Sequence, residues 1–157
     1  MQPDPMQPRM YDDIERHLGE ADDFAAAAVP TGMYLAWCAN LHLLDTDFQQ
    51  QHESLLLRLR YREITGAEFF IAACGGRFER SLLNARGQAF TDHYYPHFLD
   101  DYREVFGADT YAVKDDWAHY DLLAPVLMRH LMAPPEKASR SDSSAAGRLR
   151  KWWQSWH

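Results

Sequence analysis

The sequence contains few cysteines, and neither lies in a pattern that predicts a disulfide or a metal site. Cys38 and Cys74 are the two cysteines among 157 residues, and each lies in an apolar segment rather than in a C-x-x-C pair. Isolated cysteines of this kind are usually buried as small apolar side chains. We therefore expect two buried thiols and no disulfide.

Long hydrophobic runs are also missing. The longest apolar runs, 24-FAAAAV-29 and 122-LLAPVLM-128, are far shorter than the roughly 18 to 20 apolar residues that cross a bilayer. No basic segment followed by an apolar stretch precedes them, so the pattern of a secretory leader is absent as well. The sequence predicts no membrane span and a cytoplasmic location.

The common catalytic motifs are absent. There is no G-x-S-x-G, no P-loop and no Rossmann glycine pattern, and 75-GGRF-78 follows a predicted helix, where glycines usually end the helix. Adjacent aspartates in a helix point about 100° apart and cannot share a proton as a facing pair does. We therefore predict no catalytic residue and no cofactor. An enzyme of unknown chemistry that uses the Asp/His cluster at residues 92–101 is kept as an alternative.

Basic residues are scarce in most of the chain. Of the formal net charge of −7, residues 134–157 contribute five basic and two acidic residues, whereas residues 1–133 carry 11 basic and 21 acidic ones, a charge of −10. A protein of this sign repels nucleic acid phosphates and attracts basic partners. The composition predicts a basic protein partner and no nucleic acid partner.

Capping patterns and apolar spacing predict three helices between residues 31 and 75. Each begins at a threonine whose hydroxyl can accept a hydrogen bond from the first helical amides, and two starts carry the Glu or Gln of a capping box. In 32-GMYLAWCANLHLL-44, large apolar residues recur every three or four positions and share one face. The predicted starts are Thr31, Thr46 with Gln49, and Thr65 with Glu68; the core face of the first helix is Met33, Trp37, Leu41 and Leu44.

A fourth helix is predicted from Asn84 to Gly107, with an aromatic residue at every fourth position of its second half. On an unbroken helix, His93 and His97 would stack with a neighbouring aspartate and could bind a metal ion. Pro96 argues against this arrangement, because its ring removes an amide donor and kinks the helix between the two histidines. We therefore predict no metal site.

A fifth helix is predicted to begin near Asp115 or Asp116, with Pro125 kinking or restarting it. The single strand indication is 110-TYAV-113, which is too short to define a sheet. Together the patterns predict an all-α fold, a single compact bundle of about five to six helices with at most a minor strand near residues 110–113.

The ends of the chain differ from this helical domain in composition. Residues 134–147 are rich in Pro, Ser, Ala and Gly, without a large apolar side chain, and are typical of a linker. The last ten residues, RLRKWWQSWH, can form a basic helix with three tryptophans, suited to a membrane surface or a partner groove. The predicted organisation is a flexible N-terminus (1–9), a helical domain (10–133), a linker (134–147) and a basic Trp-rich tail (148–157).

Several short motifs, in this order and spacing, resemble a family of small acidic bacterial proteins. The motifs are 11-YDD-13, 31-TGMYLAWC-38, 64-ITGAEFF-70, 84-NARGQAF-90, 99-LDDY-102 and 111-YAVKDDWAHYDLLAPVL-127. Members of that family resemble companions of polymorphic or contact-dependent toxin systems. The resemblance implies an immunity role in which the protein binds and neutralises a cognate toxin, and it implies no catalytic residue.

Acidic and aromatic residues recur in the resembling motifs, and these are the candidate partner-binding residues: Asp12, Asp13, Asp100, Asp101, Asp116, Tyr120 and Asp121. A toxin that acts on nucleic acids or nucleotides has a basic cleft, which an acidic surface complements. The leading hypothesis is therefore an immunity protein that occludes the active cleft of a cognate protein toxin. An acidic adaptor unrelated to toxins is a further alternative, and homodimerisation is left open.

Overall fold

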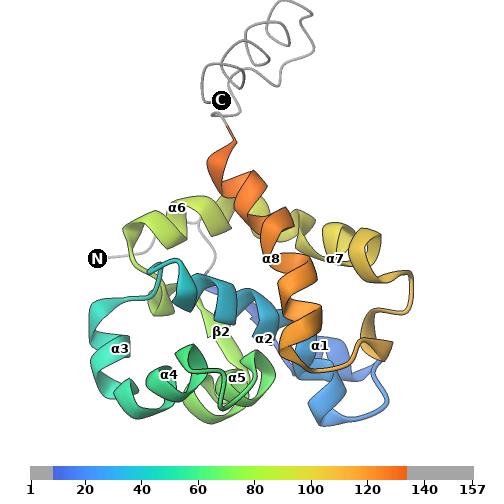
Figure 1. The fold of residues 1–157 in the computed structure, drawn as a ribbon, viewed down its shortest axis with the longest axis horizontal. Coiled ribbons are helices and arrows are strands. Elements are labelled where there is room, and N and C mark those ends of the chain that lie inside the picture. Colours follow the sequence, from blue (N-terminus) through green and yellow to red (C-terminus); the bar gives the residue numbers. More distant parts are fainter. Residues whose placement is uncertain (1–8, 134–157) are drawn as a thin grey trace, which may run out of the picture. The chain divides into compact units, whose positions relative to one another are not determined.

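The computed structural model describes residues 9–133, which form a mostly α-helical fold with one small antiparallel sheet (Figure 1). The all-α prediction is confirmed. The predicted linker and Trp-rich tail, and residues 1–8 of the predicted N-terminal segment, lie outside the described residues. In chain order, the elements are β1 (Met10–Asp13), α1 (Glu15–Leu18), α2 (Phe24–Asn40), α3 (Thr46–Gln51), α4 (Glu53–Arg60), α5 (Gly66–Cys74), β2 (Arg77–Glu79), η1 (Arg80–Leu82), α6 (Ala85–Tyr94), η2 (Tyr95–His97), α7 (Phe98–Phe106), η3 (Thr110–Ala112) and α8 (Trp117–Met132).

The central element is α2, which is buried on all sides from Ala27 to Ala39. Its N-cap is Asp23, whose carboxylate accepts a hydrogen bond from the Ala26 amide at 2.7 Å. The predicted start at Thr31 is therefore wrong, since the helix already begins at Phe24. Sequence patterning missed the first turns because a helix that is apolar on every face has no amphipathic stripe.

Helix α5 packs closely across α2, and two glycines make this approach possible. A Cβ atom on Gly32 of α2 would collide with the backbone of Gly66 and Ala67 in α5, and a Cβ atom on Gly66 would collide with the carbonyl group of Gly32. The predicted capping box of α5 is confirmed, since Thr65 and Glu68 each bond the other's backbone amide. Gly75, with φ of 60°, ends the helix in the left-handed conformation, as predicted.

We expect Gly32→Ala to destabilise the protein by about 3 kcal/mol, the upper end of the usual range for overpacking, because backbone atoms on both helices must move. Gly19→Ala is the matched control, since no atom lies within 4 Å of the added methyl group and the Gly19 backbone is helical. Chemical denaturation of both variants measures the difference. Equal stability of the two variants would show that α2 and α5 do not approach as closely as described.

The second predicted helix is divided and begins one residue earlier than expected. Asp45, not Thr46, is the N-cap of α3, because its carboxylate accepts a hydrogen bond from the Phe48 amide at 3.0 Å. At His52 the backbone leaves helical geometry, which separates α3 from α4. One apolar face continues across both helices, since Phe48, Leu56 and Leu59 are buried.

The strands lie elsewhere than predicted. Residues 110–112 form the 3-10 turn η3, and the small sheet instead pairs β1 with β2 in antiparallel register, with Asp13 opposite Arg77. The prediction of a strand near 110–113 is therefore wrong in its location. The hydroxyl of Thr110 accepts a hydrogen bond from the Arg103 Nε at 2.8 Å, which joins η3 to α7.

The aromatic segment from Asn84 to Gly107 is broken at Pro96, as predicted. Asn84 caps α6 by accepting a hydrogen bond from the Gly87 amide at 2.9 Å, η2 interrupts the helix at Tyr95–His97, and α7 continues to Gly107. Helix α8 begins at Trp117 and runs through Pro125, so of the two predicted alternatives, a kink or a restart, the restart does not occur. Among the described residues, no helix is both long enough and apolar enough to cross a membrane.

Candidate functional site

Asp12, a predicted partner contact, is buried instead, with 6% of its surface exposed. Its two carboxylate oxygens lie 2.9 and 2.8 Å from His17 Nε2. The Tyr95 hydroxyl donates a hydrogen bond to Asp12 at 2.6 Å, and the Thr31 hydroxyl does so at 3.1 Å. A side chain enclosed in this way cannot contact a partner, so the assignment of Asp12 to a binding surface is wrong.

The Asp12 network connects segments that are far apart in the sequence. On the other side of the imidazole ring, His17 Nδ1 lies 2.6 Å from the hydroxyl of Tyr111 in η3. The network therefore joins β1, α1, α2, η2 and η3, with Asp12 at its centre. We name this set the Asp12 network: Asp12, His17, Thr31, Tyr95 and Tyr111.

Burial alone would raise the pKa of Asp12, but the hydrogen bonds from His17, Tyr95 and Thr31 outweigh it, and the pKa lies below its usual range. For Tyr111, burial and the neighbouring charges of Glu20 and Asp12 raise the pKa of the phenol. The order hydroxyl, imidazole, carboxylate is that of a catalytic triad. A phenol that is held protonated is not an activated nucleophile, however. This geometry therefore favours a structural role, in which the hydrogen bonds hold the five elements together.

The alternative site at residues 92–101 is divided among different partners. Asp92 accepts a short hydrogen bond from the Tyr11 hydroxyl and forms two hydrogen bonds with the Arg80 guanidinium, at 3.1 and 2.9 Å. Asp101 accepts a hydrogen bond from Tyr94 at 2.7 Å. Within residues 9–133, no three His, Cys, Asp or Glu side chains are grouped so that they could hold a metal ion.

The candidate residues in α8 and directly before it are engaged in contacts within the protein. Tyr120 is buried, and its hydroxyl accepts a hydrogen bond from Asn40 Nδ2 at 2.8 Å, so its assignment as a partner contact is wrong. Asp121 is exposed and forms a bidentate pair with Arg62 at 3.0 and 2.8 Å. Asp116 is half-buried and accepts hydrogen bonds from the backbone amide and Nδ1 of His119 at the start of α8.

Two groups of exposed carboxylates each lie on or beside a single helix. On α7, Asp100 and Glu104 are exposed one turn apart, while Phe98 and Tyr102 of the same helix are fully buried. The second group surrounds α1 and consists of Glu15, Glu20, Asp22 and Asp23. Glu104 and this second group were not among the predicted contacts, although the four-residue step from Asp100 to Glu104 in the sequence indicates a shared helical face.

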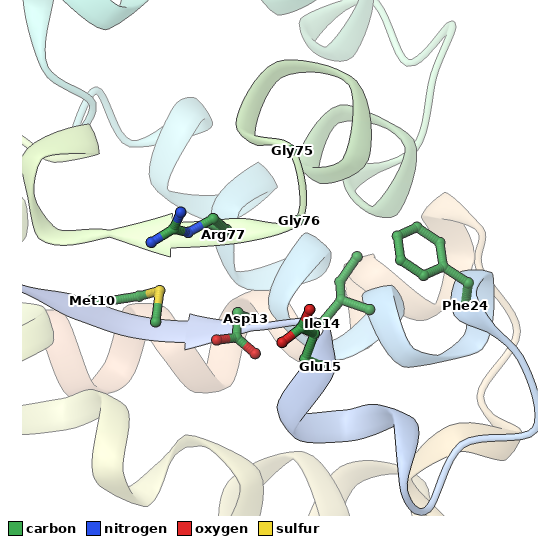
Figure 2. Close-up of a pocket in the computed structure, with 8 residues that line it drawn as sticks. All are labelled: Met10, Asp13, Ile14, Glu15, Phe24, Gly75, Gly76 and Arg77. Atoms are coloured by element: carbon green, nitrogen blue, oxygen red, sulfur yellow. The ribbon is translucent and has the colours of Figure 1, made fainter.

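A pocket of about 310 Å³ lies beside the α1 group, at the end of the two-stranded sheet. In the view of Figure 2, Ile14 separates the Asp13 carboxylate from the ring of Phe24, so the pocket has a polar side and an apolar side. Asp13 is half-buried and its carboxylate accepts a hydrogen bond from the Arg16 amide at 2.9 Å. The lining residues are Met10, Asp13, Ile14, Glu15, Phe24, Gly75, Gly76 and Arg77.

Comparison with known proteins gives one family match. No curated protein and no solved structure matches the chain. The domain of unknown function DUF7832 matches residues 10–114, a range that extends from β1 through η3 and contains the whole Asp12 network. Because this match spans about two thirds of the chain, the protein belongs to the DUF7832 family.

Proposed function

We propose that this protein is a cytoplasmic immunity protein that binds a cognate bacterial toxin and occludes its active cleft. The observation that carries the proposal is the acidic face of α7, formed by the exposed carboxylates of Asp100 and Glu104 on a helix whose opposite side is buried. A basic cleft that binds phosphate-containing substrates would be complementary to this face.

The acidic face is held rigidly. Phe98 lies against Tyr95, with ring centroids 5.4 Å apart, and against Tyr102, at 5.8 Å. At the C-terminal end of the helix, Tyr102 also packs against Phe106 at 4.8 Å. Because the carboxylates project from a helix fixed by these aromatic contacts, little conformational entropy is lost when a partner binds them.

The arrangement of the other ionisable groups supports binding rather than chemistry. Asp12 and Asp92, which could otherwise act as acids or bases, accept hydrogen bonds from groups within the protein, and the pKa of each carboxyl lies below its usual range. For Asp92, burial raises the pKa, and the hydrogen bonds from Arg80 and Tyr11 more than offset that effect. Carboxylates held in the charged form suit a structural or electrostatic role.

Co-expression tests this function. The genes adjacent to this one are searched for a toxin domain, and the absence of such a gene counts against the proposal. A toxin domain found there is expressed in a host that it kills, with and without this protein, and the two purified proteins are mixed and analysed by size-exclusion chromatography with light scattering. We expect restored growth and a stable complex. Cell death unchanged by this protein, together with no complex, would refute the immunity function.

We further expect Asp100→Asn with Glu104→Gln to slow association with that toxin by roughly threefold to tenfold at low salt, because exposed charges act mainly on the encounter rate. The effect should shrink at moderate salt, where screening shortens the range of the field. Stopped-flow or surface plasmon resonance kinetics at two salt concentrations measures the change. Glu104 replaces Asp101 in this design because Asp101 accepts the hydrogen bond from Tyr94.

The matched control is Asp22→Asn with Glu20→Gln, which removes the same charge from the α1 group and leaves the Asp23 N-cap of α2 intact. If both double variants slow association equally, net charge rather than the α7 face governs the encounter. If neither does, α7 is not the electrostatic contact. Circular dichroism of each variant establishes that the fold is retained.

A further inference from the structure

Two large apolar side chains are exposed on the outer side of α4. Leu57 is 54% exposed and Tyr61, the C-cap residue, is 73% exposed. They are four residues apart and therefore lie next to each other on one helical face. We name this pair the α4 ridge. Adjacent apolar side chains with this exposure are typical of a surface that a partner covers.

A groove lies beside the ridge, between α3 and α4, which are adjacent at one end of the fold (Figure 1). Its volume is about 530 Å³, and Leu57 belongs both to the ridge and to the groove wall. Leu56 and Leu57 form the apolar part of its wall, and the other lining residues add hydroxyl, amide and charged groups. The lining residues are Thr46, Gln49, Gln50, Glu53, Leu56, Leu57 and Arg60. Such a wall suits a tyrosine, which has an apolar ring and a hydrogen-bonding tip.

Charge on this face is balanced, unlike the rest of the described chain. The segment 53–63 carries two glutamates and three arginines, and the third arginine, Arg62, is paired with Asp121. Arg58 Nε lies 3.8 Å from Glu63 Oε2. Residues 1–133 together carry a formal charge of −10. The α4 face is therefore a region of little net charge on a strongly acidic protein.

The turn that follows Tyr61 is held in place by Arg62. Arg62 adopts a left-handed backbone conformation, with φ of 61°, which non-glycine residues rarely adopt. Its guanidinium lies 4.7 Å from the centre of the Trp117 ring and is held by Asp121. Strained residues that persist in this way are often found where a surface must be presented in a defined geometry.

We propose that the α4 ridge and groove form a symmetric interface with a second copy of this chain, in which Tyr61 of each copy enters the groove of the other. Two-fold interfaces require a self-complementary patch, and a projecting tyrosine beside a groove with apolar and hydrogen-bonding groups meets that requirement. Two acidic molecules repel each other over most of their surfaces and can approach closely where the local charge is balanced. A partner with a basic cleft is attracted to the acidic faces instead. Since the proposed interface lies on α4, the α7 face is not part of it.

Sedimentation velocity of the full chain over a wide range of concentrations tests this interface. We expect a concentration-dependent dimer, and we expect Leu57→Ser with Tyr61→Ser to weaken self-association by about 30-fold or more, as loss of a central aromatic contact does. Since both side chains are exposed, the variant should keep its melting temperature. Added salt should strengthen the wild-type dimer, because it screens repulsion between the acidic bodies.

The matched control is Leu18→Ser with Phe24→Ser, which removes a second exposed pair, 40% and 50% exposed, near the acidic α1 group. This control should dimerise like the wild type. A wild-type protein that is monomeric at all concentrations overturns the proposal, as does a dimer that the α4 variant leaves intact or that weakens with added salt. None of these outcomes depends on toxin binding, so the immunity function is tested separately.

Discussion

Replacing Trp37 by alanine is expected to lower the free energy of unfolding by about 3–5 kcal/mol, the usual cost of truncating a large aromatic side chain in a core. Trp37 is 1% exposed and lies near the C-terminal end of α2, where its ring packs against Tyr34 and Phe90 with centroid distances of 5.8 and 5.5 Å. Because these neighbours belong to different elements, they cannot all move to fill the cavity. Urea or guanidinium denaturation followed by circular dichroism measures the loss.

The control for Trp37→Ala is Phe24→Ala, which removes another ring from the same helix. Phe24 is half exposed, so its loss should change stability by much less. If the Trp37→Ala variant is as stable as the Phe24→Ala variant, this face of α2 does not contribute to the core as described.

Asp12→Ala should cost a similar amount, about 3–5 kcal/mol, because it removes one partner of a buried pair and leaves the others without an acceptor. His17, Tyr95 and Thr31 all bond the Asp12 carboxylate, and His17 itself is buried. Since these residues come from separate elements, the loss should also loosen their packing. Thermal unfolding and hydrogen exchange of the β1 and η2 amides measure both effects.

The lowered pKa of Asp12 predicts how stability depends on pH. A carboxyl whose pKa is lower in the folded than in the unfolded state contributes stability above its unfolded pKa, near the model-peptide value of 3.8. That contribution is lost as the pH falls through the folded pKa. The Asp12→Asn variant should therefore show a weaker dependence of stability on pH below about pH 4 than the wild type.

Asp100→Asn is the control for this pH dependence, since Asp100 is exposed and forms no part of the Asp12 network. Its acid unfolding curve should parallel that of the wild type. If the Asp12→Asn curve also parallels the wild type, the carboxylate contributes no pH-dependent stability. The network would then hold the fold through its hydrogen-bond geometry alone.

The predicted effects of replacing Asp12 also decide which residues are suitable for a test of toxin binding. Asp12 was a candidate contact by its position in 11-YDD-13, and its replacement would reduce toxin binding simply by loosening the fold. Asp100 and Glu104 avoid this difficulty because they are exposed. A binding test based on the α7 face therefore separates electrostatic contact from stability in a way that a test based on Asp12 cannot.

The predictions that the structure confirms rest on interactions between residues close in sequence. The capping box of Thr65 and Glu68, the Asn84 cap and the glycine stops at Gly75 and Gly107 each depend on groups within about one helical turn. Pro96 interrupts its helix because proline has no amide hydrogen to donate. The predicted helix starts at Thr31 and Thr46 were wrong, because Asp23 and Asp45 are the N-caps of α2 and α3.

The sequence by itself thus determined that the fold is helical and where several helices begin and end, because capping and backbone restriction are local. Only the tertiary structure decided which acidic residues are buried. Asp12 meets Tyr95 across 83 positions, and His17 meets Tyr111 across 94. An aspartate that faces solvent and one that joins a buried histidine have the same local pattern, and the choice between them depends on side chains brought together by packing.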